Sequence, residues 1–189
     1  MEHRFELPAS YKKWTWGLII AGLVALLYGF IMFHPFAHAG HGENINSTRF
    51  WAVLLQNSVY WLLVVNAAMF FICVTTMAMG GWQIAFRRVS EAISSVVPVL
   101  GIITLVILLA IVFGHRTDIY HWLDTEAVAN DKILKGKSGF LNPTFFIVCS
   151  VVSIGLWWLL GKKMRTLSLK TDEAPMDYDT AKKWIWNNT

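Results

Sequence analysis

Four long runs of apolar residues limit what this chain can fold into more than any other feature of its sequence. The first, Trp14–Phe33, has twenty residues and no charged side chain. At about 1.5 Å per residue it is long enough to cross a hydrocarbon core of about 30 Å. The others occupy residues 50–79, 94–114 and 144–161, and 56% of the 189 residues are hydrophobic, which is uncommon in soluble domains. We therefore expect an all-α integral membrane protein whose four transmembrane helices, within residues 14–162, form an antiparallel bundle.

A short amphipathic helix is predicted between the second and third runs, over residues 80–93. Its apolar side comprises Trp82, Ile84, Ala85, Phe86, Val89 and Ile93, and its polar side comprises Gln83, Arg87, Arg88 and Glu91. This pattern is typical of a helix on a membrane face, with its aromatic residues at headgroup level and its arginines in water or on lipid phosphate.

The distribution of Lys and Arg predicts the orientation. Eleven of the 16 lie in the N-terminal tail (residues 1–13), in the 80–93 connection and after the fourth run, and five lie in the two other loops. The positive-inside rule therefore places both termini, including the 163–189 segment, and the amphipathic helix in the cytoplasm.

Two groups of polar residues near the ends of the runs are candidate sites. On the periplasmic side, His115, Asp118 and His121 would share one side if the third helix continued past residue 114. Histidine beside a carboxylate could relay protons or bind a quinone carbonyl, and it could equally form a salt-bridge cluster that caps the helix. On the cytoplasmic side, Glu91 with Arg87 and Arg88 is the second candidate for a proton path.

Polar residues within the runs permit two interpretations. Asn57 and Asn66 are nine residues apart, so they lie on opposite sides of a helix, where they could bond neighbouring helices or line a polar pathway. Pro98 predicts a kink and Gly101 a flexible point, and the kink could be structural or could line a polar cavity. Ser94, Ser95 and Thr104 are available to satisfy the carbonyls that such a kink frees.

The sequence predicts that this chain binds no metal and no redox cofactor. The loop with His34, His38 and His41 has glycines and no cysteine, so nothing rigid fixes a ligand geometry. Cys73 and Cys149 have no partner at the spacing of a metal or haem site. None of the six histidines lies inside a predicted helix, which argues against a haem b anchor.

Four motifs, in order, resemble a known family: Arg49-Phe-Trp-Ala before an asparagine-bearing helix, Gly81-Trp-Gln-Ile-Ala-Phe-Arg-Arg-Val-Ser-Glu-Ala, Tyr120-His-Trp, and Phe140-Leu-Asn-Pro. Together they resemble the second large membrane subunit of bacterial alternative complex III, an NrfD-like subunit similar to the membrane anchors of polysulfide reductase. The resemblance runs from about residue 49 to the end of the chain. That family has more membrane helices than the four expected here, so the chain resembles the N-terminal part of the subunit.

The resemblance implies a quinol:cytochrome c oxidoreductase in the bacterial inner membrane. Menaquinone, haem c and iron–sulfur clusters would belong to partner subunits: a multihaem cytochrome, an iron–sulfur subunit and a sister NrfD-like subunit. Quinol oxidation is assigned to that sister subunit, so this chain would hold partners together and contribute to proton passage. The alternative is a small homo-oligomeric transporter or channel, for which inverted repeats would be expected, and the two helix pairs show no such similarity.

Overall fold

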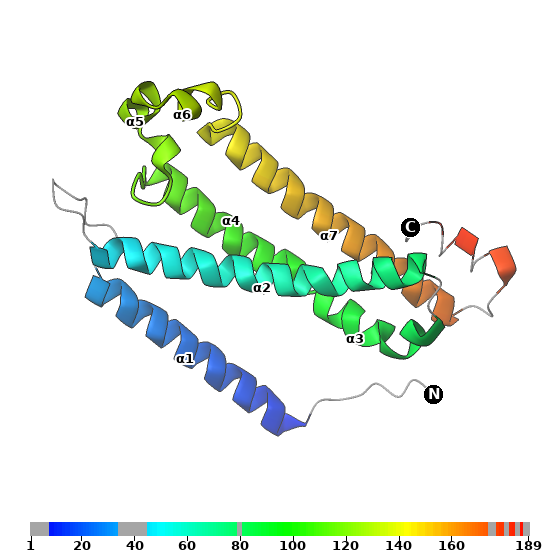
Figure 1. The fold of residues 1–189 in the computed structure, drawn as a ribbon. Coiled ribbons are helices and arrows are strands. Elements are labelled where there is room, and N and C mark those ends of the chain that lie inside the picture. The colour runs from blue at the N-terminus through cyan, green and yellow to red at the C-terminus, as the bar shows by residue number, and fades with distance from the viewer. Residues whose placement is uncertain are drawn as a thin grey trace. The chain divides into compact units, whose positions relative to one another are not determined.

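A computed structural model shows the chain as a series of helices (Figure 1) and describes residues 8–33, 45–78, 81–173, 177–179, 182–183 and 186. The helices in chain order are α1 (Ala9–Phe33), α2 (Ile45–Met77), the 3-10 helix η1 (Gly81–Gln83), α3 (Ile84–Ser94), α4 (Val97–Phe113), the 3-10 helix η2 (His121–Leu123), α5 (Thr125–Asn130), α6 (Lys132–Gly136) and α7 (Pro143–Glu173). The described residues contain no β-strand, so the predicted all-α class is confirmed.

Four helical segments are long and apolar enough to cross a membrane: Ala9–Phe33, Ile45–Met77, Gly81–Phe113 and Pro143–Lys170. They coincide with most of each of the four predicted runs, while the side on which the termini lie stays a prediction. The last helix extends well past the predicted boundary at residue 161. Its additional turns begin with Lys162 and Lys163, which favour helix, and they bury Met164 and Ser168 against other helices.

The chain divides into two compact units, residues 1–52 and 53–189. In the first unit, Phe50 of α2 packs against two aromatic rings of α1. Its ring centroid lies 5.2 Å from that of Phe30, edge to face, and 6.4 Å from that of Phe33. Gly29 makes this approach possible, because a Cβ atom there would lie 3.1 Å from the Phe50 ring.

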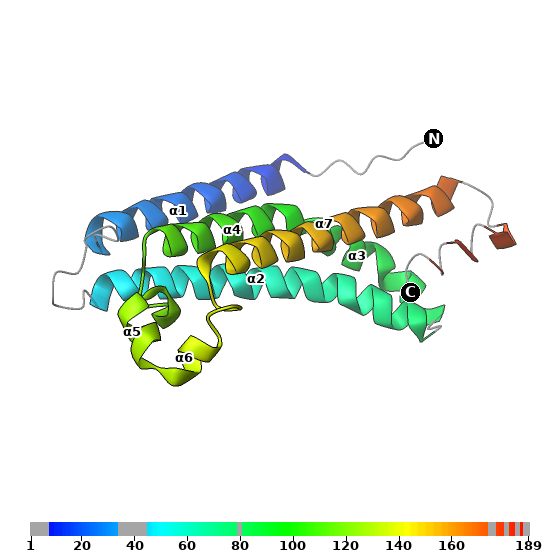
Figure 2. The same ribbon diagram turned by 90° about the horizontal axis from the view of Figure 1, so that it is seen from above.

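In the second unit, α4 runs antiparallel to both α2 and α7. Val97 packs against Leu62 and Val65 of α2, and the Thr104 hydroxyl donates a hydrogen bond of 3.3 Å to the Ser58 carbonyl oxygen. In both views α4 and α7 lie side by side (Figures 1 and 2), and α5 and α6 lie in the connection between them. The predicted antiparallel arrangement is therefore present among these three helices.

The predicted break near Pro98 is present, and it separates α3 from α4 at Ser95 and Val96. Pro98 lies in the first turn of α4, where its missing N–H costs nothing. The Ser94 and Ser95 hydroxyls donate to the carbonyl oxygens of Glu91 and Ala92 at 2.9 and 2.6 Å, so they satisfy carbonyls at the end of α3 as expected.

Gly101 was expected to add flexibility and instead allows two helices to pack closely. A Cβ atom at this position would lie 2.6 Å from Cγ2 of Ile154 on α7. That distance is far inside a normal van der Waals contact, so only glycine fits without a shift of α4 or α7.

Candidate functional site

The α3 helix turns its polar side toward the protein and its apolar side outward. Gln83, Glu91 and Ser94 are buried, whereas Trp82, Ile84, Phe86 and Val89 are exposed. Arg87 and Arg88 both bind the buried Glu91, and their side chains are 10% and 39% exposed. Contact of these arginines with water or lipid phosphate stays a prediction. In a membrane this arrangement presents apolar side chains to lipid and keeps the charged groups among protein partners.

Glu91 is the centre of this polar cluster. Its side chain is only 6% exposed, its Oε1 lies 3.3 Å from Nε of Arg87, and its Oε2 lies 2.7 Å from a terminal guanidinium nitrogen of Arg88. Arg87 and Arg88 precede Glu91 by four and three positions in one helix, which brings the charges to one face. Two cations beside one carboxylate allow its burial, since an isolated charge would be very costly there.

Arg88 also joins α3 to α7. Its guanidinium donates to the Ser168 hydroxyl at 3.2 Å and to the Ser168 carbonyl oxygen at 3.3 Å. Ser168 is completely buried, and it lies beyond the last predicted membrane helix. Its involvement could not be recognised from the sequence, because the predicted fourth helix ended at residue 161.

Gln83 joins the start of α3 to the end of α2. Its side-chain oxygen accepts a hydrogen bond from the Thr75 hydroxyl, and its amide nitrogen donates to the Thr76 hydroxyl at 3.1 Å. All three side chains are buried. We name the residues Thr75, Thr76, Gln83, Arg87, Arg88, Glu91 and Ser168 the polar junction, because their bonds connect α2, α3 and α7.

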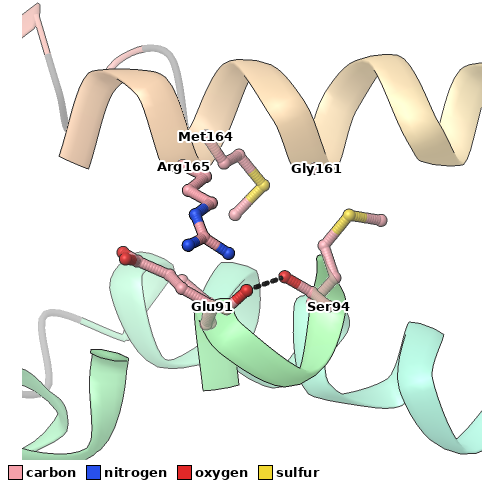
Figure 3. Close-up of a pocket in the computed structure, with 7 residues that line it drawn as sticks. Glu91, Ser94, Gly161, Met164 and Arg165 are labelled. Carbon is pink, nitrogen blue, oxygen red and sulfur yellow. Dashed lines mark hydrogen bonds between the residues drawn. The ribbon is translucent and has the colours of Figure 1, made fainter. Parts of the chain in front are cut away.

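A narrow space lies between the polar junction and the core of the unit. It is lined by Met69, Ile72, Glu91, Ser94, Gly161, Met164 and Arg165, and it is too narrow for a water-sized sphere. Figure 3 shows the Arg165 side chain reaching from α7 toward Glu91. The Cys73 thiol lies 3.8 Å from the Met164 sulfur within the adjacent apolar cluster. On this side Glu91 therefore has no space for water, and its neighbours are apolar except for Ser94 and Arg165.

The His115, Asp118 and His121 group does not share one helix face, because α4 ends at Phe113. His115 has a φ of +46°, and the N–H groups of His115 and Arg116 donate to the carbonyl oxygens of Val112 and Ile111 at 3.2 Å each. This is the Schellman pattern, in which the left-handed position usually carries glycine. His115 therefore ends the helix, and His121 and Asp118 follow on exposed turns.

Aromatic residues around η2 hold this turn against α7. The ring centroids of Tyr120, Trp122 and Phe146 lie 5.4 Å from one another. Burial raises the pKa of the Tyr120 phenol above its ordinary value. A few residues later, the Asn142 side chain caps α7 by accepting a hydrogen bond of 2.7 Å from the Phe145 N–H.

The two asparagines of α2 have different surroundings. Asn57 is exposed and donates to the Val53 carbonyl oxygen of its own helix at 2.8 Å, so it does not bond a neighbouring helix through that group. The side-chain oxygen of Asn66 is buried and has no hydrogen-bond partner. Their placement on opposite sides agrees with the helical period, and no described contact joins either of them to the polar junction.

Among the described residues, no group of three His, Cys, Asp or Glu side chains could hold a metal ion. His34, His38 and His41, which were considered as metal ligands from the sequence, lie outside the described residues.

The fold defines an all-helical, multi-pass membrane protein with a buried polar junction where three of its helices meet. No family model, curated protein or solved structure matches the chain.

Proposed function

We propose that this chain is a membrane subunit of a respiratory quinol:cytochrome c oxidoreductase of the alternative complex III type, in which it holds partner subunits together. One observation carries the proposal: three of the four motifs that resemble the NrfD-like subunit contribute to contacts between helices, and the fourth caps α7. Motif residues used for packing rather than for a cofactor site fit a scaffolding subunit.

The contributions of the four motifs lie in separate parts of the structure. Phe50 packs on α1, and the 81–92 motif supplies Gln83, Arg88 and Glu91 to the polar junction. Trp122 packs on Phe146 of α7, and the remaining motif supplies the cap of α7. Under the proposal, menaquinone, haem c and iron–sulfur clusters belong to the partner subunits in the bacterial inner membrane.

Scaffolding fits the surroundings of Glu91 better than proton passage does. The carboxylate is held by two arginines, and the space on its core side admits no water-sized sphere. Proton transfer through a membrane protein needs a chain of water or titratable groups. Among the described residues no hydrogen bond joins the polar junction to Asn66, whose side-chain oxygen is buried without a partner.

The test is purification of the tagged full chain from mild-detergent membranes, followed by mass spectrometry, a visible spectrum and a menaquinol-dependent cytochrome reduction assay. We expect multihaem cytochrome and iron–sulfur subunits to co-purify with activity. A colourless homo-oligomer without these partners would refute the proposal and favour the transporter alternative.

A variant separates scaffolding from proton passage. Glu91→Gln should lower the amount of complex recovered and leave the turnover per cytochrome haem unchanged. A normal amount of complex with reduced turnover would instead show that Glu91 takes part in the reaction.

A further inference from the structure

A groove lies beside the polar junction, between the start of α4 and the last apolar turns of α7. It has a volume of about 210 Å³, and its lining includes Ser95, Pro98, Trp157, Trp158, Lys162 and Arg165. Because one water molecule occupies about 30 Å³ in the liquid, the groove has room for a phosphate group and part of the glycerol attached to it.

The groove lies where the sequences of α4 and α7 change from apolar to polar. The apolar part of α4 follows Ser94 and Ser95, and the apolar run of α7 ends at Gly161, directly before Lys162. Two spans that change character at the same level mark the boundary between hydrocarbon and headgroups. The lining of the groove suits this boundary, because it combines proline and tryptophan with two cations.

Positive charge at the groove exceeds the negative charge available to neutralise it. Glu91 is already bound by Arg87 and Arg88, and among the described residues no carboxylate lies within salt-bridge distance of Lys162 or Arg165. Lys162 is also held in place, because its ammonium nitrogen lies 5.7 Å from the centre of the Trp158 ring.

We propose that this groove binds the phosphate of an anionic phospholipid. The Lys162 ammonium and the Arg165 guanidinium contact the phosphate oxygens, and Trp157, Trp158 and Pro98 contact the glycerol and the upper acyl carbons. Cations at this depth attract anionic lipid, and tryptophan is the residue most suited to the interface. The proposal concerns lipid binding alone and does not depend on the respiratory role.

The experiment is a lipid titration of the purified full chain in detergent, with bound lipid counted by native mass spectrometry. The probes are phosphatidylglycerol, phosphatidylcholine and inorganic phosphate. We expect one phosphatidylglycerol to bind more tightly than phosphatidylcholine, and Lys162→Gln/Arg165→Gln to weaken its binding about tenfold or more. The matched control is Lys163→Gln/Lys170→Gln, which removes the same charge from exposed positions of α7 outside the groove, and it should change binding less than about twofold.

A charge-conserving variant guards against a folding defect. Lys162→Arg/Arg165→Lys should bind phosphatidylglycerol nearly as well as the unaltered chain. Three results would overturn the proposal: equal weakening by the control pair, equal binding of phosphatidylcholine, or displacement of the lipid by millimolar inorganic phosphate, which would identify a site for free phosphate.

Discussion

Replacement of Glu91 by glutamine tests the polar junction most directly. The substitution keeps the size of the side chain and its ability to accept hydrogen bonds, and it removes the negative charge. Arg87 and Arg88 would then lose the carboxylate that they share, and the side chain of Arg87 is only 10% exposed. The folded state would therefore lose the negative charge that offsets these two neighbouring cations.

The expected loss follows from the burial of the three groups. Removing one partner of a buried ion pair costs about 3–5 kcal/mol, because an uncompensated charge is left behind. Arg88 is 39% exposed and can be resolvated in part, and glutamine retains an oxygen acceptor. We therefore expect Glu91→Gln to lower the free energy of unfolding by about 2–3 kcal/mol.

A double-mutant cycle in detergent gives the measurement, with unfolding followed by circular dichroism during titration with sodium dodecyl sulfate. Arg88→Gln/Glu91→Gln should lose less than the sum of the two single variants, with a coupling of about 1–2 kcal/mol. Glu126→Gln, at an exposed acid in α5, is the control and should change stability by less than about 0.5 kcal/mol. The reasoning is wrong if Glu91→Gln behaves like this control or if the two single changes add.

The same titration tests three further positions. Gly101→Ala should lose about 1–3 kcal/mol, because its methyl group would lie 2.6 Å from an isoleucine of α7, whereas Gly155→Ala meets no atom within 4 Å and should lose nothing. His115→Gly should be as stable as the original chain or up to about 1 kcal/mol more stable, since its φ of +46° suits glycine; a loss would contradict the Schellman assignment. Gln83→Ala should lose about 1–2 kcal/mol by removing the buried hydrogen bonds between Gln83 and two threonine hydroxyls, and Gln56→Ala, at an exposed position of α2, should lose less than about 0.5 kcal/mol.

Much of the fold could be predicted because it depends on properties that adjacent residues share. A twenty-residue run without charge is a membrane helix in almost any context, so the four candidate spans follow from hydropathy alone. An interruption near Pro98 was predicted for a similar reason, as a kink, since proline removes a backbone donor. In the structure the interruption is a break at Ser95 and Val96, before α4. The end of α4 was predicted to within one residue, because the apolar run stops at residue 114. The conformation that closes the helix could not be predicted, because His115 adopts a left-handed conformation in which glycine is more usual.

The polar junction was recognisable only in part. The spacing of Arg87, Arg88 and Glu91 on one helix face is a local property, and it correctly grouped these residues. Their partner Ser168 is 80 positions away from Arg88, and no periodicity within either helix connects the two. The role of Gly101 likewise depends on Ile154, a residue of another helix, so the sequence could indicate its freedom and not its contact.

The orientation of α3 shows why an amphipathic pattern is ambiguous in a membrane protein. The pattern fixes which side chains share a face, and it leaves two solutions: the polar face can meet water at the membrane surface, or it can meet other helices while the apolar face meets lipid. The second solution requires that carboxylates offset positive charge on the polar face and that its partners be polar. Both conditions hold here, because Glu91 offsets one of the two arginine charges and Thr75 and Ser168 bond Gln83 and Arg88. Two features of the sequence therefore favour the solution in which the polar face meets other helices. One is a carboxylate that offsets arginine charge on that face, and the other is the presence of hydroxyl residues near the ends of neighbouring spans.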